Sequence, residues 1–267
     1  MIKLSAVIIT YNEEKNIERC ILSLKSLADE IVVIDSFSTD KTEEICKKHN
    51  VNFSKHKFEG HIQQKNYALT CTNNNYILSL DADEAISAKL KEKILDVKSN
   101  WKYDAYRVNR YNNYCGQWIK HSNWYPDRKT RLFDKRKGQW GGINPHDKFI
   151  LNKNCTRKNL HADLLHWVIP SYYAHIDKAN KFSSIAATEA FNRGNKANIL
   201  TIFSHSFWRF IKTYFLKKGF LDGYNGFVIS AFTSYTVFLK YIKLRQINLE
   251  KDKNNNKYQK NIPKIAE

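Results

Sequence analysis

Short apolar runs alternate with amphipathic segments through the first hundred residues of the chain. Residues 4–9 and 30–34 are rich in Val and Ile, and residues 13–27 between them carry apolar side chains at helical spacing. Strands that are apolar throughout and separated by helices are typical of a parallel sheet covered on both faces. The pattern therefore predicts an α/β fold.

The same alternation continues to residue 84. A helix is predicted over residues 41–49, a strand near 51–54, a helix over 61–70 and a strand over 76–80. Ligands of such sheets bind outside the carboxyl ends of the strands. Asp35 and Asp81 each come directly after a predicted strand, so we expect both carboxylates at the ligand-binding edge.

The second half of the chain is less regular. Residues 103–149 are rich in Asn, Arg, Trp and Tyr, as expected of strands and loops that cover a cleft. Residues 203–244 predict two helices broken around residues 219–226, and the polar residues 251–267 predict a disordered tail. We expect one core with an appended helical segment.

Charge and cysteine content narrow the classes of function. The formal net charge is +18, which predicts attraction to nucleic acid, anionic lipid or phosphorylated glycan, and the cations concentrate after Trp101. The five cysteines are scattered and form no C-x-x-C pair. The apolar start is too short for a signal peptide, so a reducing, cytoplasmic setting is expected.

Two carboxylates one residue apart follow the fourth predicted strand. Alternate residues of an extended segment point the same way, so Asp81 and Asp83 can face one cleft. Their hard oxygen atoms suit Mg²⁺ or Mn²⁺ that bridges substrate phosphates. A D-x-D segment without other evidence is more often a helix N-cap with solvated carboxylates than a metal site. Asp35 by itself could equally be a residue that only forms a turn. Their shared position at neighbouring strand ends favours a ligand site.

Three motifs occur together in this order: VIITYNEE at residues 7–14, IDSFSTDKT at 34–42 and LDADE at 80–84. With them the chain resembles the family-2 inverting glycosyltransferases of GT-A fold. The resemblance implies a mostly parallel sheet flanked by helices, a nucleotide-sugar donor and a divalent metal. One departure is Phe37, where many members have Gly.

The resemblance also implies roles for single residues. Asp35 would contact the nucleotide base, and the turn with Tyr11 and Glu13 would lie against the uridine. Asp81 and Asp83 would bind the metal and the donor diphosphate.

Two further roles follow from the resemblance. The segment GHIQQKNYAL at residues 60–69 is similar to a helix that carries a basic residue toward the donor phosphates, which nominates Lys65. Inversion needs a base that takes the proton of the acceptor hydroxyl. Asp147 is the best match, although relatives often carry Glu there, and Asp127 is the reserve candidate. The alternative for Asp147 is a buried hydrogen-bonded pair with His146.

A second set of motifs narrows the subgroup. WYPDRKTRLF at residues 124–133, Trp140, PHDKF at 145–149 and GFLDG at 219–223 are similar to the lipopolysaccharide core heptose β-1,4-glucosyltransferases. This implies transfer of a hexose, with UDP-glucose as donor and a glycolipid or oligosaccharide as acceptor.

We expect a transferase domain over 1–205 (nucleotide-sugar half 1–100, acceptor half 101–205), a helical membrane-proximal extension over 206–250 and a tail over 251–267.

The extension predicts contact with an anionic membrane surface. Its apolar run, residues 226–239, is shorter than the roughly 20 residues that span a bilayer. Aromatic residues mixed with Lys and Arg suggest a helix in the membrane interface, at the inner face of the cytoplasmic membrane. Helices packed on the domain are the alternative.

The basic cluster within residues 128–137 fits a solvated loop or the docking of a phosphorylated glycolipid equally well.

Two other functions were weighed. A sugar-nucleotide nucleotidyltransferase needs a Gly-rich phosphate loop after the first strand, and residues 10–14 contain no glycine. A nucleic-acid-binding protein would explain the charge but leaves the strand-end acids without a purpose, so no nucleic acid partner is expected. We assign no role to His161, His166 and His175, whose spacing fits no metal site.

Overall fold

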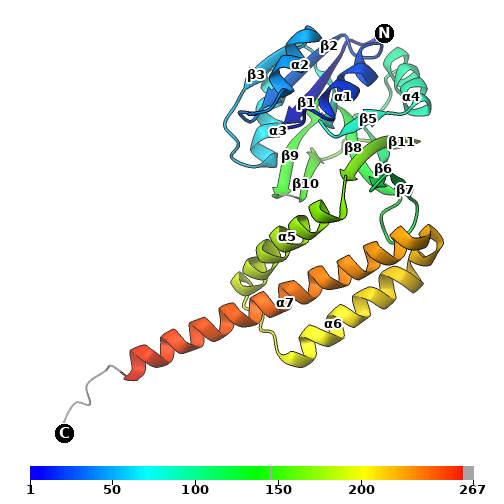
Figure 1. Ribbon diagram of the computed structural model, residues 1–267. Helices are drawn as coiled ribbons and strands as arrows, with labels where there is room; N and C mark the ends of the chain where they lie inside the picture. The colour runs from blue at the N-terminus through cyan, green and yellow to red at the C-terminus, as the bar shows by residue number, and fades with distance from the viewer. Residues whose placement is uncertain (145, 261–267) are drawn as a thin grey trace. The chain divides into compact units, whose positions relative to one another are not determined.

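The computed structural model describes residues 1–144 and 146–260, and the chain divides into two compact units (Figure 1). The first unit comprises Met1–Asn113 and Tyr125–Val168, and the second comprises Tyr114–Trp124 and Ile169–Glu267. The boundary falls at the end of the long strand β11 (Arg157–Ile169).

The first unit contains the predicted α/β sheet, whose strands follow the order β3-β2-β1-β4-β8-β6-β11-β5. Besides β11, the strands of this order are β1 (Leu4–Thr10), β2 (Glu30–Asp35), β3 (Asn52–Lys55), β4 (Tyr76–Asp81), β5 (Glu84–Ile86), β6 (Ala105–Tyr114) and β8 (Asp127–Asp134). The helices are α1 (Ile17–Leu24), α2 (Thr42–Lys48), α3 (His61–Thr70) and α4 (Ala88–Ser99). Strands β3, β2, β1 and β4 are parallel, which confirms the predicted α/β fold of GT-A type.

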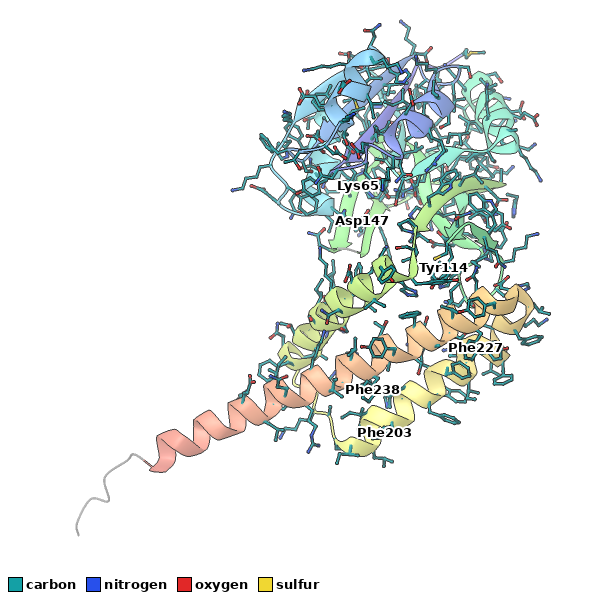
Figure 2. The ribbon with its side chains drawn as sticks, viewed as in Figure 1. Lys65, Tyr114, Asp147, Phe203, Phe227 and Phe238 are labelled. Atoms are coloured by element: carbon teal, nitrogen blue, oxygen red, sulfur yellow. The ribbon has the colours of Figure 1, made fainter. Side chains whose placement is uncertain are left out.

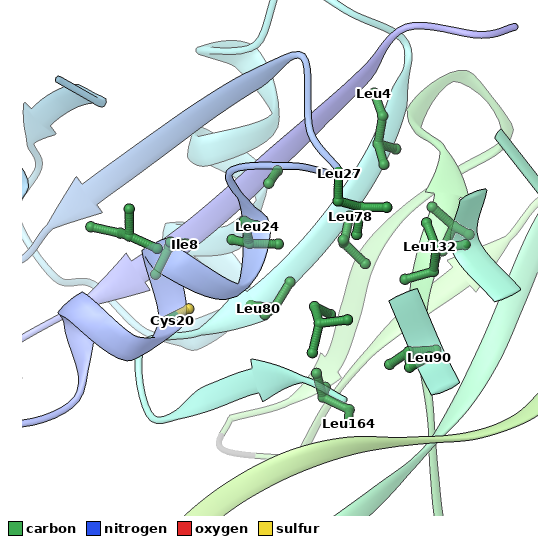
Figure 3. Close-up of a cluster of buried hydrophobic side chains, with 14 of the residues drawn as sticks. Leu4, Ile8, Cys20, Leu24, Leu27, Leu78, Leu80, Leu90, Leu132 and Leu164 are labelled. Atoms are coloured by element: carbon green, nitrogen blue, oxygen red, sulfur yellow. The ribbon is translucent and has the colours of Figure 1, made fainter. Parts of the chain in front are cut away.

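The apolar spacing of α1 explains how it covers the sheet. Its buried side chains, among them Cys20 and Leu24, pack with Ile8 of β1 and Leu80 of β4 (Figure 3). Each aliphatic side chain buried in this way contributes about 1.5 to 3 kcal/mol. The cluster therefore holds the ends of β1 and β4 in fixed positions.

The strand register brings two predicted site residues to one edge of the sheet. Thr10 of β1 lies opposite Asp35 of β2, and Ile9 lies opposite Asp81 of β4. Both acids therefore end strands that flank β1. The placement expected from the alternating sequence pattern is confirmed.

Beyond β4 the sheet becomes antiparallel. β8 pairs antiparallel with β4, and β6 pairs antiparallel with β8. β11 pairs antiparallel with β5, so that His166 lies opposite Glu84. A separate two-stranded sheet joins β9 (Gly138–Ile143) to β10 (His146–Leu151). The irregular part of the sequence thus supplies the strands that continue the sheet past β4.

Three helices make up most of the second unit: α5 (Tyr172–Asn192), α6 (Ile199–Ile211) and α7 (Gly223–Lys260). α7 packs against both α5 and α6 (Figure 1). The two helices expected in the sequence are present as α6 and α7, with the break between them at η2 (Lys212–Leu216) and η3 (Gly219–Asp222).

The GFLDG motif at residues 219–223 shapes this break. A Cβ atom added to Gly226 would lie 1.8 Å from the backbone oxygen of Gly219, so the approach of the two segments requires glycine. The carboxylate of Asp222 accepts backbone N–H groups of Lys120 and His121 at 3.2 and 2.8 Å. The motif therefore holds the loop of residues 114–124 within the second unit.

The C-terminal helix is longer than the sequence pattern suggested. The segment Gly219–Lys251 is long and apolar enough to cross a membrane by length and composition, so our argument that the apolar run is too short was wrong. α7 also continues to Lys260, through residues that we expected to be disordered. Adding residues to an existing helix costs little compared with nucleating one. Residues 261–267 lie outside the described residues.

We predict that His175 makes the second unit sensitive to acid. The Tyr114 hydroxyl shares a hydrogen bond with His175 Nδ1 at 2.8 Å, and burial together with the charge of Lys178 lowers the pKa of His175 to about 4. The unfolded chain binds this proton near pH 6.5, so stability is present above that pH and is lost as the pH falls toward 4. Between pH 7 and pH 5 the loss should be on the order of 1 to 2 kcal/mol.

Urea unfolding at the two pH values measures this loss. In the variant His175→Asn the part of the pH dependence that comes from this residue should disappear. An unchanged difference between pH 7 and pH 5 in the variant would show that other groups cause it.

Candidate active site

The carboxylate of Asp35 is fully buried at the end of β2. It accepts the backbone N–H of Ser38 at 2.8 Å and also the Ser38 hydroxyl. The loop after β1 joins the same turn, because Asn12 N donates to Ser38 Oγ and Thr39 N donates to Asn12 Oδ1, both at 2.8 Å. Asp35 therefore shapes the turn, and its contact with a nucleotide base stays a prediction.

Phe37 adopts the backbone conformation that glycine favours. Its φ of 62° lies in the left-handed region, which costs a residue with a side chain about 1 kcal/mol or more. The turn thus keeps a glycine-like path although Phe stands where many members of the resembled family have Gly. The ring is 55% exposed, beside the strand end that carries Asp35.

The loop after β1 carries the other two residues predicted to contact the nucleotide. Tyr11 is exposed. Burial raises the pKa of Glu13, and the charge of Asp83 raises it further. The hydrogen bond that Asn16 Nδ2 donates to Glu13 at 2.6 Å acts in the opposite direction. The carboxylate of Glu13 is therefore close enough to Asp83 to feel its charge, and its contact with the uridine stays a prediction.

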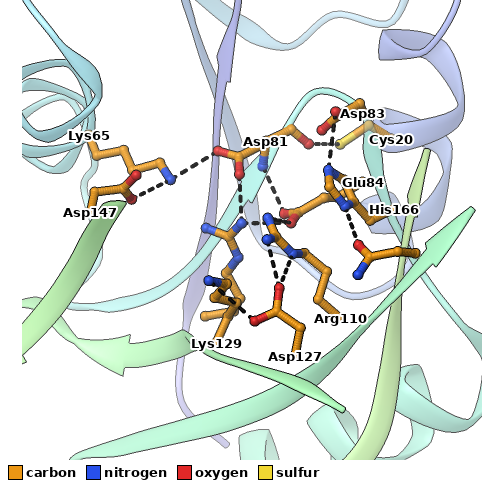
Figure 4. A network of polar contacts seen from close by, with 12 residues as sticks. Cys20, Lys65, Asp81, Asp83, Glu84, Arg110, Asp127, Lys129, Asp147 and His166 are labelled. Carbon is orange, nitrogen blue, oxygen red and sulfur yellow. Dashed lines mark hydrogen bonds and ion pairs between the residues drawn. The ribbon is translucent and has the colours of Figure 1, made fainter. Parts of the chain in front are cut away.

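Eight charged side chains of alternating sign form one network at the end of β4 (Figure 4). In order they are Asp147, Lys65, Asp81, Arg131, Glu84, Arg110, Asp127 and Lys129. Four acids and four bases cancel, which is how buried charges are tolerated in a protein interior. The two candidate bases, Asp147 and Asp127, lie toward opposite ends of this network.

Asp81 is held between two cations. Its Oδ2 lies 2.6 Å from Arg131 Nη2, and its Oδ1 lies 3.0 Å from Lys65 Nζ. Burial alone would raise the pKa of Asp81, but Arg131 and Lys65 hold that pKa well below its usual range. Asp81 is therefore ionised, and its charge is already balanced inside the unit.

Lys65 is buried rather than directed to solvent. Its Nζ donates to Asp147 Oδ2 at 2.8 Å and lies 4.6 Å from the centre of the Trp140 ring. The side chain is 4% exposed, and that of Asp147 is 12% exposed. One lysine of α3 thus joins the first acid of the D-x-D to the acid of β10 that we nominated as the base (Figure 2).

Asp83 has a partner to which we assigned no role. Its Oδ2 lies 3.3 Å from His166 Nε2, and His166 Nδ1 is 2.6 Å from Asn112 Oδ1. The ring of His166 therefore lies between the amide of Asn112 and the carboxylate of Asp83. His166 orients Asp83 through tertiary contact, which the sequence spacing does not reveal.

The fit of a divalent metal rests on Asp81 and Asp83. Among the described residues, no group of three or more His, Cys, Asp or Glu side chains could hold a metal ion. Asp81 Oδ1 is buried and forms an ion pair with Lys65 Nζ at 3.0 Å but accepts no aligned hydrogen bond. A carboxylate oxygen that can exchange this ion pair, on the same segment as the second carboxylate Asp83, fits an ion that also takes oxygen atoms from a bound diphosphate and from water.

The basic cluster of residues 128–137 is not one surface. Arg131 is buried in the charge network, and Lys135 Nζ donates to the backbone oxygen atoms of Leu69 and Thr72. Arg136 pairs with Asp134 at 2.7 Å. Of the two alternatives left open for this cluster, docking of a phosphorylated glycolipid does not suit Arg131 and Lys135, because their charged groups are directed to partners within the unit.

Sequence reasoning missed Glu84, Arg110 and Arg131 as members of the site. Glu84 is fully buried, and besides its ion pairs it accepts the backbone N–H of Asp81 at 3.0 Å. Arg131 comes from β8, which pairs with β4, and Arg110 comes from β6, which pairs with β8, so both reach the site only in the folded sheet. The final Glu of LDADE could have indicated that arginines lie here, because an acid next to an apolar strand needs a cation as its partner.

Comparisons with known proteins agree with these motifs. Residues 5–159 match the family model of "Glycosyl transferase family 2". A Rickettsia bellii protein described as an uncharacterized glycosyltransferase is 33% identical over 93% of this chain and 88% of its own length. The Rhizobium meliloti lipopolysaccharide core biosynthesis glycosyltransferase LpsC is 26% identical over 91% of this chain and 92% of its own. Among solved structures, S. aureus TarS 1–349 in complex with UDP-GlcNAc has a TM-score of 0.45 at 14% identity, over 94% of this chain and 92% of that one.

We predict that Arg131 is required for stability. Replacing it in Arg131→Met leaves Asp81 and Glu84 without their closest cation, and breaking a buried ion pair costs about 3 to 5 kcal/mol. Lys129→Met removes a partly exposed cation at the end of the same network and should cost less than about 1 kcal/mol. Urea unfolding at pH 7 compares the two variants. Similar small losses for both would contradict the buried network.

Proposed function

Because the chain belongs to glycosyl transferase family 2, we propose that it transfers a hexose, from UDP-glucose, onto a saccharide of the lipopolysaccharide core or a related glycolipid, with inversion. The family shows that the protein is a glycosyltransferase, which excludes the two alternative functions, a sugar-nucleotide nucleotidyltransferase and a nucleic-acid-binding protein. The observation that carries the proposal is the ionised Asp81 at the strand edge, linked through Lys65 to a second carboxylate, Asp147.

The donor site is proposed at the edge formed by β1, β2 and β4. Asp35 and Tyr11 would contact the uridine, and Glu13 would line the same loop. Asp81 and Asp83 would hold Mg²⁺ or Mn²⁺, which when bound with the donor diphosphate supplies positive charge to the leaving group. This assignment is supported by Asp81 Oδ1, whose ion pair with Lys65 Nζ at 3.0 Å is not an aligned hydrogen bond and can be exchanged for the metal.

Lys65 has a proposed part in binding the donor. Before the donor arrives, its ammonium group is shared by Asp81 and Asp147. Phosphate oxygen atoms near Asp81 would compete for the same N–H donors, and charge-assisted hydrogen bonds to phosphate are strong. Movement of Lys65 toward the donor would release the carboxylate of Asp147 to accept the acceptor's proton.

Of the two candidate bases, Asp147 is favoured over Asp127. Burial raises the pKa of Asp127, but Arg110 and Lys129 more than offset this, and the net effect lowers it. Arg110 donates to Asp127 through both Nε and Nη2, at 2.9 and 2.7 Å. A carboxylate fixed in this way is a weak base, whereas Asp147 has one hydrogen bond to a lysine.

The proposed acceptor and location rest on the family context. LpsC is named for lipopolysaccharide core biosynthesis, and a lipid-linked acceptor would bring the enzyme to the inner face of the cytoplasmic membrane. We propose peripheral attachment there through the second unit.

The metal assignment is tested by Asp83→Asn. Transfer from UDP-glucose in the presence of Mn²⁺ should fall below detection, while the unfolding midpoint should change little because Asp83 is not a core residue. His166→Gln serves as the matched control, since it removes the partner of Asp83 but not the carboxylate, and it should keep part of the activity. Transfer by Asp83→Asn within a few-fold of the parent would remove Asp83 from the metal site.

The base assignment is tested by comparing Asp147→Asn with Asp127→Asn. The first should lower kcat by about two to four orders of magnitude, the usual share of general-base catalysis, and should leave UDP affinity within a few-fold. The second should act mainly on stability. Calorimetry with UDP and steady-state kinetics separate the two effects, and a large loss of kcat in Asp127→Asn alone would reverse the assignment.

A further inference from the structure

Helix α6 of the second unit leaves an apolar face uncovered. Leu200, Phe203 and Phe207 follow one another at helical spacing, and their exposed fractions are 75%, 62% and 69% (Figure 2). Ile202 and Ser206 of the same helix are buried, and the Phe203 ring lies at the border with α7, with its centre 6.1 Å from that of Phe238. Side chains three, four and seven residues apart lie on one side of a helix. Large apolar side chains gathered on an exposed face mark an interaction surface.

Further exposed apolar side chains follow the end of α6. Phe215, Leu216, Phe220 and Leu221 are each about half exposed. These residues belong to the two short turns that connect α6 to α7. The apolar surface is therefore built by successive segments of one unit and does not depend on a single side chain.

A groove of about 450 Å³ lies between α6 and α7 and contains three cations, Arg209, Lys212 and Lys240. Ser204 and Trp208 also line the groove, and each directly follows a residue of the apolar face, about 100° further around the helix. The groove therefore adjoins the apolar face of α6.

The cations of the groove differ from those of the charge network. Within the described part of the chain, Arg209, Lys212 and Lys240 form no ion pair with a carboxylate. Residues 199–221 contain four cations and not one Asp or Glu. Unpaired cations held close together repel one another, and a phosphate group relieves that repulsion.

We propose that α6 is the lipid-docking helix of this protein. Its apolar face enters the acyl region of an anionic bilayer, while Arg209, Lys212 and Lys240 bind the phosphates of lipid head groups. Trp208, which is 57% exposed between the two surfaces, occupies the head-group depth that suits an indole. The proposal deepens the peripheral location proposed above and names the surface that makes the contact.

The contacts of α7 favour this arrangement over a spanning helix. Lys243 Nζ donates to Asn180 Oδ1 at 2.7 Å and to Ser183 Oγ at 2.8 Å, both on α5. Crossing the bilayer would break these bonds and carry Lys240 and Lys243 toward hydrocarbon. α7 therefore stays packed against α5 and α6 when α6 lies on the membrane.

Sedimentation of the full chain with vesicles of phosphatidylglycerol and phosphatidylcholine tests the proposal. At low salt the chain should bind these vesicles and should not bind phosphatidylcholine alone. The triple variant Arg209→Gln, Lys212→Gln, Lys240→Gln should lower the affinity about 100-fold, since each cation near an anionic surface contributes roughly a five-fold factor. Phe207→Ser should lower it about ten-fold or more through lost apolar burial.

Matched controls separate a specific surface from general attraction. Lys25→Gln, Lys89→Gln and Lys153→Gln together remove the same charge from exposed positions of the first unit, and this variant should bind within about three-fold of the parent. Phe58→Ser removes an exposed ring of the first unit and should have no effect on vesicle binding.

Three results would overturn the docking surface: equal losses in the two triple variants, vesicle binding that survives both the triple variant and Phe207→Ser, or resistance to alkaline extraction as a spanning helix shows. UDP binding, measured by calorimetry on the same samples, should be unchanged in the groove variants. If the chain binds UDP but does not bind the vesicles, the proposed docking surface is wrong and the proposed transferase site is unaffected.

Discussion

An ionised carboxylate inside a protein needs its opposite charge within a few ångströms, and Asp81 at the end of β4 imposes that requirement on the whole first unit. Lys65 reaches it from α3 and Arg131 reaches it from β8, at 3.0 and 2.6 Å. Arg131 is itself buried and needs Glu84 as a second acid. Each partner added in this way fixes another element of the fold. The antiparallel strands past β4 are therefore as necessary to the site as the parallel strands that carry the acids.

The same balance of charge has consequences for ligand binding. In the free protein the acids of the network are already neutralised, so a bound diphosphate and its metal must exchange partners with side chains that are in place. Lys65 is suited to such an exchange because one ammonium group serves two carboxylates. Arg131 is not, since its pairs with Asp81 and Glu84 are both at 2.6 Å and buried. The network thus combines a fixed ion pair, that of Arg131, with a lysine, Lys65, that can change partners when the donor binds.

The two units use positive charge in different ways. In the first unit the cations of the charge network lie opposite acids and hold strands together. In the second unit Arg209, Lys212 and Lys240 line one groove without acids, beside a face of exposed aromatic side chains. Paired charge of the first kind supports a fold, whereas unpaired charge of the second kind attracts a partner. The charge network therefore contributes nothing to the net charge of +18, because its four acids and four bases cancel.

The parallel sheet, the family and the edge at which Asp35 and Asp81 lie can be predicted from the sequence alone, because apolar strand runs and strand-end acids are local patterns. The sequence also indicates the break between the last two helices. It could not place Arg110, Arg131 or His166 beside the D-x-D segment, since these residues meet Glu84, Asp81 and Asp83 across 26, 50 and 83 positions of sequence, and no local periodicity records such contacts. The folded arrangement is needed to show that Lys65 joins Asp81 to Asp147 and which cations stay unpaired, because ion pairing depends on distance in space and on burial.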